Sequence, residues 1–172
     1  MTYAAPDRPK TLLRDGRTMA FRPIAPDDGP RLCDHVARSS AESRRLRFFK
    51  STSRLDPNFA DRLAEVDHRR RCAFVGHLCG DDAIRAVGRY EATAPGEAEI
   101  AFLIEDEFQG HGLGRELFEL LAENAARNGI KRFTAMVLPE NRKMIGMFER
   151  MGRPMSVRTD GCTLLVELDL AA

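Results

Sequence analysis

The stretch from Gln109 to Arg115 constrains this chain most, because it reads Gln-Gly-His-Gly-Leu-Gly-Arg between an alternating strand pattern and an amphipathic helix pattern. Glycine has no Cβ, so the backbone there can turn tightly and lie close to a ligand. The helix that follows offers unpaired N–H groups and the positive end of its dipole. These features favour a cradle for a phosphate or pyrophosphate group, and a plain strand–helix turn is the alternative.

Two familiar nucleotide-binding motifs do not fit this stretch. A dinucleotide fold carries G-x-G-x-x-G after an early strand, whereas the spacing here is G-x-G-x-G and lies late in the chain. An ATPase-type phosphate loop ends in Gly-Lys-Ser or Gly-Lys-Thr, whereas Gly114 is followed by Arg115 and Glu116. What remains is a pyrophosphate cradle without a metal-binding hydroxyl.

The composition is that of an ordinary soluble globular protein. The chain has 172 residues, of which 43% are hydrophobic and 31% charged, and its formal net charge is +1, which suits one domain with a real core. A near-neutral balance argues against a nucleic-acid partner. No apolar run is long enough to span a bilayer, and Arg14-Asp15 interrupts the only N-terminal apolar run, so we predict no membrane partner and a cytoplasmic location.

The cysteines predict neither a disulfide framework nor a metal site. Cys33, Cys72, Cys79 and Cys162 are scattered and form no C-x-x-C pair. His77 lies close to Cys79, but no second ligand pair follows at a spacing that suits zinc. We therefore expect reduced, mostly buried thiols and no bound metal.

The order of elements predicts an α+β, or mixed α/β, architecture with one central, mostly antiparallel sheet flanked by helices. Residues 1–16 are expected to form a flexible tail and residues 17–172 a single domain. The patterns indicate strands over 17–24, 72–78, 83–93, 97–105, 133–138, 157–159 and 162–170. They indicate helices after Asp27 or Asp28, over 58–66, from 113 to the cap at Gly129, and from the cap at Asn141 to Gly152. Residues 39–50 are polar and basic, and no element is assigned to them.

Residues Glu97 to Glu105 alternate in a way that separates two faces of one strand. Ala98, Ile100, Phe102 and Ile104 fall on one face. Glu99, Ala101 and Leu103 fall on the other. A carboxylate therefore shares a strand with the residues that lead into the glycine-rich cradle.

These residues carry a resemblance to a known family. Gln109-Gly-His-Gly-Leu-Gly114 resembles the Q/R-x-x-G-x-G/A signature of the GNAT acetyltransferase superfamily, and 137–152 resembles the strand and helix that follow it there. More narrowly, Ser43–Phe49, Ala98–Ala101 and Leu138–Met144 resemble the catalytic domain of bacterial Pat-type protein lysine acetyltransferases. Those enzymes often carry a regulatory or synthetase-like domain, which is not expected within this length.

The resemblance implies acetyl-CoA as cosubstrate, with no metal, and it assigns roles to particular residues. The backbone of Phe102, Leu103 and Ile104 would pair with the pantetheine arm like an added strand. Asn141 would contact the cofactor beside the strand ends. The pyrophosphate would be held by the backbone of Gln109, Gly110, His111, Gly112, Leu113, Gly114 and Arg115. His111 could also contact phosphate through its ring, or be an exposed loop residue.

Glu99 matches the catalytic glutamate of that family and is our candidate general base, acting directly or through a water. The alternative is a glutamate on a solvated strand face. Glu97 and Glu105 compete with it and rank below it, since Glu97 lies at the start of the strand and Glu105, beside Asp106 and Glu107, suggests a solvated acidic turn. Many of these enzymes have a tyrosine as an acid for the thiol, where this chain has Phe148. Phenylalanine cannot donate a proton. Either this chain lacks that acid, or Phe148 is simply a core residue.

Three functions remain open. The first is an acetyl-CoA-dependent N-acetyltransferase acting on a protein lysine, the second acetylates a small amine, and the third binds acyl-CoA without turnover. The basic cluster Arg44, Arg45, Arg47 and Lys50 could face an acidic protein substrate or be a solvated helix face. The acceptor, the acyl-chain preference and the oligomeric state, including a homodimer, are left open by the sequence.

Acetyl-CoA is expected to stabilise the folded chain, because a ligand that binds only the folded state shifts the unfolding equilibrium by mass action. At 100 times its Kd the gain in the free energy of unfolding is about 2.7 kcal/mol. Thermal unfolding measures this gain, with NAD and ATP as controls that should stabilise much less. The absence of any shift with acetyl-CoA would count against all three functions.

Overall fold

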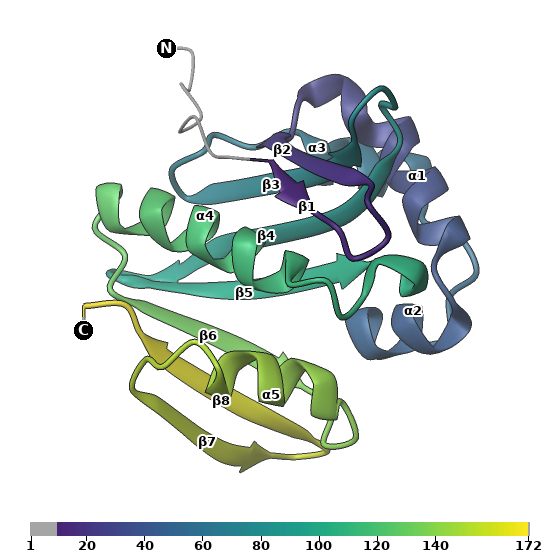
Figure 1. Ribbon diagram of the computed structural model, residues 1–172. Coiled ribbons are helices and arrows are strands. Elements are labelled where there is room, and N and C mark those ends of the chain that lie inside the picture. Colours follow the sequence, from purple (N-terminus) through teal and green to yellow (C-terminus); the bar gives the residue numbers. More distant parts are fainter. Residues whose placement is uncertain (1–9, 172) are drawn as a thin grey trace.

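One eight-stranded sheet runs through the part of the chain that the computed structural model describes, residues 10–171 (Figure 1). The strand order is β1-β2-β3-β4-β5-β6-β8-β7. Every neighbouring pair is antiparallel except β5 with β6, which is parallel. The strands are β1 (Thr11–Leu12), β2 (Thr18–Pro23), β3 (Arg71–Leu78), β4 (Ile84–Ala94), β5 (Glu97–Ile104), β6 (Arg132–Val137), β7 (Met155–Asp160) and β8 (Thr163–Asp169).

Within residues 10–171, five α-helices flank the sheet, and this confirms the predicted fold class. They are α1 (Gly29–Arg38), α2 (Ala41–Phe48), α3 (Pro57–Ala64), α4 (Leu113–Arg127) and α5 (Arg142–Glu149), with short 3₁₀ turns η1 (Pro26–Asp28) and η2 (Asp106–Phe108). Residues of α4 and α5 join the buried cluster on one face of the sheet. Residues of α1 and α3 join the cluster on the other face, with Phe48 of α2 packed against it.

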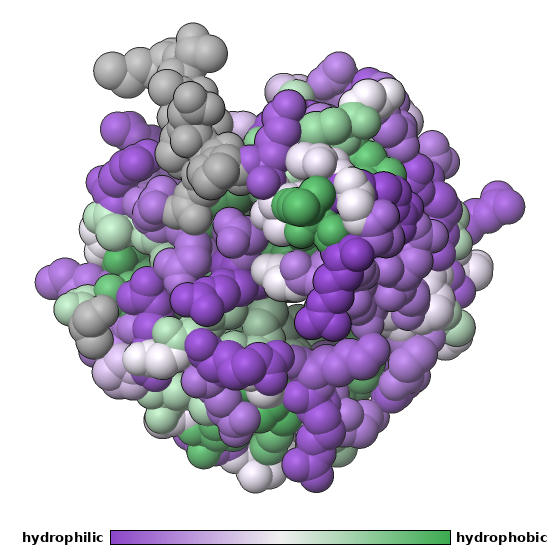
Figure 2. All heavy atoms as spheres, viewed as in Figure 1, coloured by the Kyte–Doolittle hydropathy of each residue, from purple (hydrophilic) through white to green (hydrophobic). Residues whose placement is uncertain are grey.

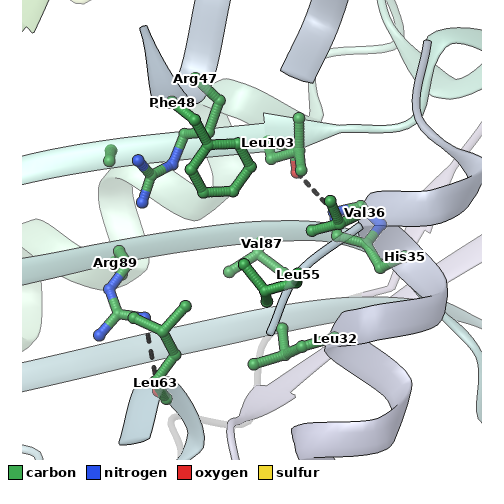
Figure 3. A pocket seen from close by; sticks show the side chains of 11 residues that line it. Leu32, His35, Val36, Arg47, Phe48, Leu55, Leu63, Val87, Arg89 and Leu103 are labelled. Carbon is green, nitrogen blue, oxygen red and sulfur yellow. Dashed lines mark hydrogen bonds between the residues drawn. The ribbon is translucent and has the colours of Figure 1, made fainter. Parts of the chain in front are cut away.

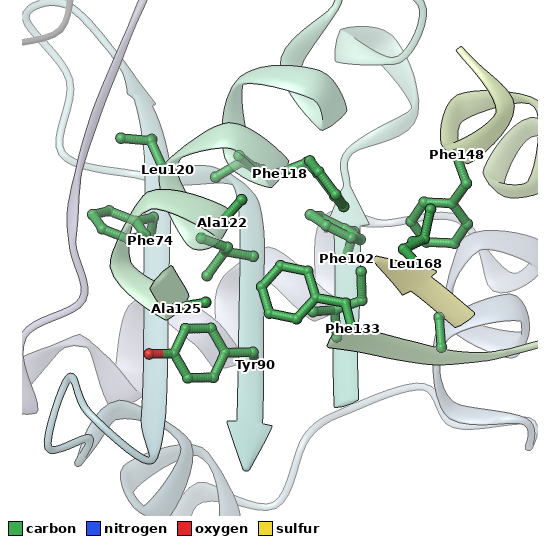
Figure 4. Close-up of a cluster of buried hydrophobic side chains, with 14 of the residues drawn as sticks. Phe74, Tyr90, Phe102, Phe118, Leu120, Ala122, Ala125, Phe133, Phe148 and Leu168 are labelled. Atoms are coloured by element: carbon green, nitrogen blue, oxygen red, sulfur yellow. The ribbon is translucent and has the colours of Figure 1, made fainter. Parts of the chain in front are cut away.

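Aromatic rings hold the sheet against α4 and α5 (Figure 4). The Phe118 ring of α4 meets Phe133 of β6 edge to face, with ring centroids 5.8 Å apart. Phe148 of α5 lies 6.5 Å from Phe118 and 6.4 Å from Phe102 of β5, also edge-on. Such pairs add to the burial of their apolar area, so this cluster fixes how the β5 and β6 halves of the sheet sit against α4 and α5.

The alternation predicted for β5 is confirmed. Ala98, Ile100 and Phe102 are buried in the cluster under α4, and Ile104 packs against its edge. Leu103 is buried in the cluster on the opposite face. The strand is thus covered on both sides over most of its length, and Glu99 is its one exposed residue.

The hairpins around Gly80 and Gly161 and the helices ended by Gly129 and Gly152 are confirmed, and each of these glycines has a positive φ. One helix was missed, α2 (Ala41–Phe48), in the polar stretch left unassigned. Its start is fixed by the Ser40 side chain, which accepts a hydrogen bond from the Ser43 N–H. No residue of α2 is fully buried, so its sequence lacks the apolar stripe by which an amphipathic helix is predicted.

Two further expectations concern the chain's start and its thiols. The tail predicted for residues 1–16 lies outside the described residues as far as residue 9. Within the remainder of that tail, Thr11–Leu12 pairs with β2 and Leu13 is buried.

The four cysteines are free thiols as predicted, but the expectation that they are mostly buried was wrong, since Cys79 and Cys162 are exposed. Over residues 10–171, no helix is both long and apolar enough to cross a bilayer.

Candidate active site

Strands β5 and β6 pair over three residues only and then separate. The paired positions are Glu97 with Arg132, Ala98 with Phe133 and Glu99 with Thr134. Beyond them β5 continues to Ile104, still paired with β4 on its other edge. β6 continues to Val137, paired with β8. Among the described residues, the facing edges of both strands therefore carry peptide groups that have no strand partner.

The gap is visible between the two ribbons, which diverge toward the end where α4 and α5 begin (Figure 1). The space-filling view shows a hollow at this place, with an apolar floor and a hydrophilic rim (Figure 2). From Glu99 to Ile104 the strand advances five residues, which is about 17 Å at the usual rise. The hollow thus offers a groove along β5 that leads from the start of α4 to Glu99.

Five consecutive amide groups lie unpaired at the end of this groove. The Gln109 N–H donates to Asp106 O at 3.2 Å, and the Arg115 and Glu116 N–H groups donate to Gly112 O at 3.1 and 3.2 Å. Between them, in the described part of the chain, the N–H groups of residues 110–114 have no acceptor. Clustered free N–H groups at the start of a 15-residue helix are an arrangement that can bind an anion.

The glycines of this stretch have separate structural reasons. Gly110 and Gly112 adopt φ of 79° and 85°, a region that residues with a Cβ rarely enter, and a Cβ on either would meet open space. The cradle is therefore not packed shut by side chains. Gly114 has an ordinary helical backbone, but a Cβ there would collide with the sulfur of Met147. Gly114 thus permits the close approach of α4 and α5.

Three side chains predicted for the cofactor site make contacts within the protein. The Gln109 amide donates to Ser43 Oγ at 3.1 Å and to Ile104 O at 3.0 Å, and its oxygen accepts from Lys143 Nζ at 2.8 Å. His111 Nδ1 accepts from the Arg14 N–H at 3.2 Å. Asn141 is 8% exposed and caps α5 by accepting from the Met144 N–H at 3.2 Å. These residues hold the walls of the groove in place.

Glu99 lies at the last paired position of β5, and its side chain is exposed on the face away from α4. No ion pair engages its carboxylate within residues 10–171. Glu97, on the same strand face, is held by Arg132 at 2.8 Å. A free carboxylate at the junction of diverging strands is placed to exchange a proton with a ligand in the groove.

The expectation that Glu105 belongs to a solvated acidic turn was wrong. Glu105 is 5% exposed. Its carboxylate accepts from Arg38 Nε at 2.8 Å, lies 3.3 Å from His35 Nδ1, and pairs with Arg85 at 3.3 Å. Burial alone would raise the pKa of Glu105, but the hydrogen bonds from His35 and Arg38 and the charge of Arg38 outweigh it and hold the pKa below the usual 4.5. This network anchors the end of β5 to α1 and β4.

Asp106, the next residue, ties α2 to the same place. Its carboxylate accepts hydrogen bonds from the Ser40 N–H and Oγ, each at 2.8 Å, and from Ser43 Oγ at 2.9 Å. Arg45 of α2 pairs at 2.8 Å with Glu140, in the loop after β6. The two walls of the groove are therefore linked by polar contacts on the α2 side.

Phe148 is a core residue, 1% exposed between Phe102 and Phe118. It has no hydroxyl to protonate a leaving thiolate. Among the described residues the one tyrosine is Tyr90, which is buried and donates to Asn124 Oδ1 at 2.5 Å. Within residues 10–171, no tyrosine lies exposed to act as an acid.

The basic side chains of α2 and the residues just after it, Arg44, Arg45, Arg47 and Lys50, do not act as a unit. Arg44 is held by backbone oxygens of Thr52 and Ser39, and Arg45 by Glu42 and Glu140. Arg47 instead lines a pocket on the sheet face that carries Glu99. Neither an acidic-substrate face nor a simple solvated face describes all of these residues.

Comparisons with known proteins agree with this geometry. The family described as acetyltransferase (GNAT) domain matches residues 18–153. The chain belongs to the GNAT acetyltransferase family, and it is an acetyl-CoA-dependent N-acetyltransferase of the EC 2.3.1 class. The Pat-type resemblance is also supported by individual relatives.

The crystal structure of the GNAT domain of Streptomyces lividans PAT is 36% identical, with a TM-score of 0.87, and the match covers 98% of this chain and 99% of that one. Acetyltransferase PA5475 of Pseudomonas aeruginosa is 33% identical over 77% of this chain and 73% of its own length. Acetyltransferase Pat of Mycolicibacterium smegmatis is 30% identical over 92% of this chain. The match spans 47% of that Pat protein.

Gly112→Ala is expected to weaken acetyl-CoA binding by about tenfold or more, because relieving a positive φ turns neighbouring N–H groups away from the anion. Gly129→Ala is the matched control, since Gly129 also has a positive φ (75°) and open space at its Cβ but lies at the other end of α4. Both should lose about 1 kcal/mol of stability. Titration calorimetry measures the affinities. Equal weakening by both substitutions would contradict the cradle.

Glu105→Gln is expected to lower the free energy of unfolding by about 3 kcal/mol at pH 7, since it leaves arginines without their carboxylate. The folded-state pKa of Glu105 is depressed, so its contribution is present above the usual value of 4.5 and is lost as the pH falls through the folded pKa. The difference from the parent should therefore shrink toward zero at acidic pH. Denaturant unfolding at both pH values measures it. A loss independent of pH, or one no larger than for Glu97→Gln, would contradict this role.

Proposed function

We propose that this protein transfers an acetyl group directly from acetyl-CoA to a primary amine, the side chain of a protein lysine, with Glu99 as general base. The observation that carries the proposal is the position of Glu99 at the last pair of β5 with β6, where a free carboxylate meets the inner end of the groove. We further propose that residues 17–172 form one domain that contains the whole reaction site.

The residues along the groove suit acetyl-CoA. The free N–H groups of residues 110–114 can bind the diphosphate. Beyond Glu99 the edge of β5 at Phe102, Leu103 and Ile104 no longer pairs with β6, and we propose that it pairs with the amides of the pantetheine arm. An arm held at both places points along β5 toward Glu99. Asn141, already fixed by its helix cap, borders the opposite wall.

The chemistry asks two things of the protein. Acetyl-CoA supplies the thioester carbonyl, and the amine must reach it neutral, although a free lysine titrates near 10.4. Glu99 accepts the proton as the amine nitrogen forms its bond to the carbonyl carbon and the carbon–sulfur bond breaks. Because Glu99 is exposed, it can pass that proton to water. A thiol titrates near 8.5, so the sulfur can leave as a thiolate and take a proton from solvent.

A protein lysine is the acceptor we favour over a small amine. The likeness to Pat proteins and the Pat-type stretches of the sequence support it. The exposure of Glu99 supports it as well, since a side chain presented from a protein surface can reach it. A non-catalytic acyl-CoA sensor is the remaining alternative, and turnover tests it directly.

Glu99→Gln is expected to lower kcat by about 10²–10⁴-fold, because amide nitrogen cannot take up the proton. The Kd for acetyl-CoA should stay within about threefold, since the substitution keeps the shape of the side chain. Glu97→Gln is the matched control, as it removes a carboxylate from the same strand face two residues away and should leave kcat close to the parent value. Thiol release in the presence of a lysine peptide measures the rate.

Unchanged turnover in Glu99→Gln would remove Glu99 from the mechanism. The acceptor is tested by incubating the protein with labelled acetyl-CoA and cell lysate and separating protein from small molecules. Label in lysine residues of proteins is the expected outcome. Label confined to small molecules would favour the second function, and no label beyond hydrolysis would favour the sensor.

A further inference from the structure

A small pocket opens on the sheet face that carries Glu99, between that face and helices α1, α2 and α3 (Figure 3). Its walls are mostly apolar and include Val36, Phe48, Leu55 and Val87. Two arginines also line it, Arg47 from α2 and Arg89 from β4. Arg89 pairs in register with Ala101, and the next pair on that face is Glu91 with Glu99. The pocket therefore adjoins the proposed general base.

Arg89 is a buried cation with little to satisfy it. The residue is 7% exposed, and its Nη1 donates a single long hydrogen bond of 3.4 Å to Leu63 O. Its Nη2 is buried without any hydrogen-bond partner among the described residues. Buried polar groups are nearly always paired, and a guanidinium has five N–H donors to place. A hydrogen-bond acceptor from a ligand could therefore satisfy the Nη2 group of Arg89.

Arg47 faces the same space. Its guanidinium stacks over the Phe48 ring at 4.9 Å, and the described part of the chain offers it neither an ion pair nor a hydrogen bond. The guanidinium groups of Arg47 and Arg89 lie on the same side of the pocket (Figure 3). Two positively charged side chains thus border one mostly apolar pocket, and no carboxylate is among its described lining residues.

The other charges around this pair do not neutralise it. Burial, and then the positive charges of Arg47 and Arg71, lower the pKa of Arg89 to about 10, and Glu91 opposes this only in part. Burial likewise lowers the pKa of Arg47, opposed by Glu99. Neither Glu91 nor Glu99 forms an ion pair with these arginines within residues 10–171. With a pKa of about 10, Arg89 keeps its charge at neutral pH, and the pocket is positive.

We propose that Arg47 and Arg89 bind a carboxylate of the acceptor, close to the amine from which Glu99 takes a proton. This inference rests on the proposed function and adds a specificity site to it. The pocket's internal space of about 30 Å³ holds about two water molecules, which suits a carboxylate and not a whole substrate. Guanidinium forks match carboxylates in shape, and apolar walls strengthen such bonds.

The carboxylate can come from two sources with the same chemistry. It is either the main-chain carboxylate of an amino-acid-like acceptor or an acidic side chain beside the acceptor lysine in a protein. Acceptor pairs that differ only in this charge separate the sources. The first pair is Nα-acetyllysine and Nα-acetyllysine amide. The second is a set of blocked lysine peptides that carry either Glu or Gln at one flanking position.

In the parent protein, one of these carboxylate acceptors is expected to have a KM about tenfold to a hundredfold lower than that of its neutral partner. This factor is the usual gain in affinity from hydrogen bonds to charged groups. Arg47→Gln and Arg89→Gln should each remove most of that preference through KM, with kcat on neutral acceptors little changed. Arg47 is half-buried at the pocket edge, so Arg47→Gln provides the test if Arg89→Gln fails to fold. Arg158→Gln, on the exposed strand β7, is the matched control and should keep the preference.

Binding without turnover separates this inference from the proposed function. Nα-acetyllysine, its amide and the peptide pairs are titrated into the complex with coenzyme A, and their affinities are measured by calorimetry. Stronger binding of a carboxylate form that depends on Arg47, with no acetylation of any amine, would support the pocket and contradict the proposed function. Equal binding and use of both members of every pair, or a preference that survives in Arg47→Gln and Arg89→Gln alike, would overturn the inference.

Discussion

The three-residue contact between β5 and β6 is the constraint on which the rest of this structure depends. Each strand keeps a full-length antiparallel partner, β4 for β5 and β8 for β6, so the two can separate after Glu99 without either losing its place in the sheet. In the described part of the chain, the facing edges are left with peptide groups that have no strand partner, which are costly unless a side chain, water or a ligand satisfies them. Because the chain leaves β5 at the open end and enters α4 there, the free N–H groups of residues 110–114 collect at the mouth of the same gap. One topological feature thus produces both the groove and the cluster of free N–H groups at its mouth.

The two faces of the sheet carry different kinds of residues. On the α4 face, Phe102, Phe118 and Phe148 pack edge to face and fix the angle between the halves of the sheet. The other face carries Glu99, the arginine-lined pocket and the buried Glu105 network. That network clamps the end of β5 to α1, and Asp106 clamps it to α2. These contacts hold the end of β5 in place beside the groove, and the chemistry and acceptor selection that we propose would take place on the face away from α4.

Local sequence patterns predicted most of this fold because strand alternation, helix caps and turns depend on residues close together in the sequence. Alternation in 97–105, the glycine that ends α4 and the Asn141 cap depend on near neighbours, and all were found. Helix α2 was missed because it buries no residue fully and so leaves no apolar stripe to detect. Glu105 was misplaced because its partners His35 and Arg38 lie about seventy residues away in sequence, as the separations of 70 and 67 show. Arg89 gave no signal at all, since one charge inside an apolar strand pattern is ordinary. The lack of a partner for its Nη2 becomes apparent only when β3, β4, α2 and α3 are assembled.

The crystal structure of the protein with coenzyme A tests the central claim most directly. The account predicts density in the gap between β5 and β6, with the diphosphate within hydrogen-bond distance of the amide nitrogens of residues 110–114 and the sulfur near Glu99. Coenzyme A bound elsewhere, or strands that close and pair beyond Glu99 in the complex, would contradict it.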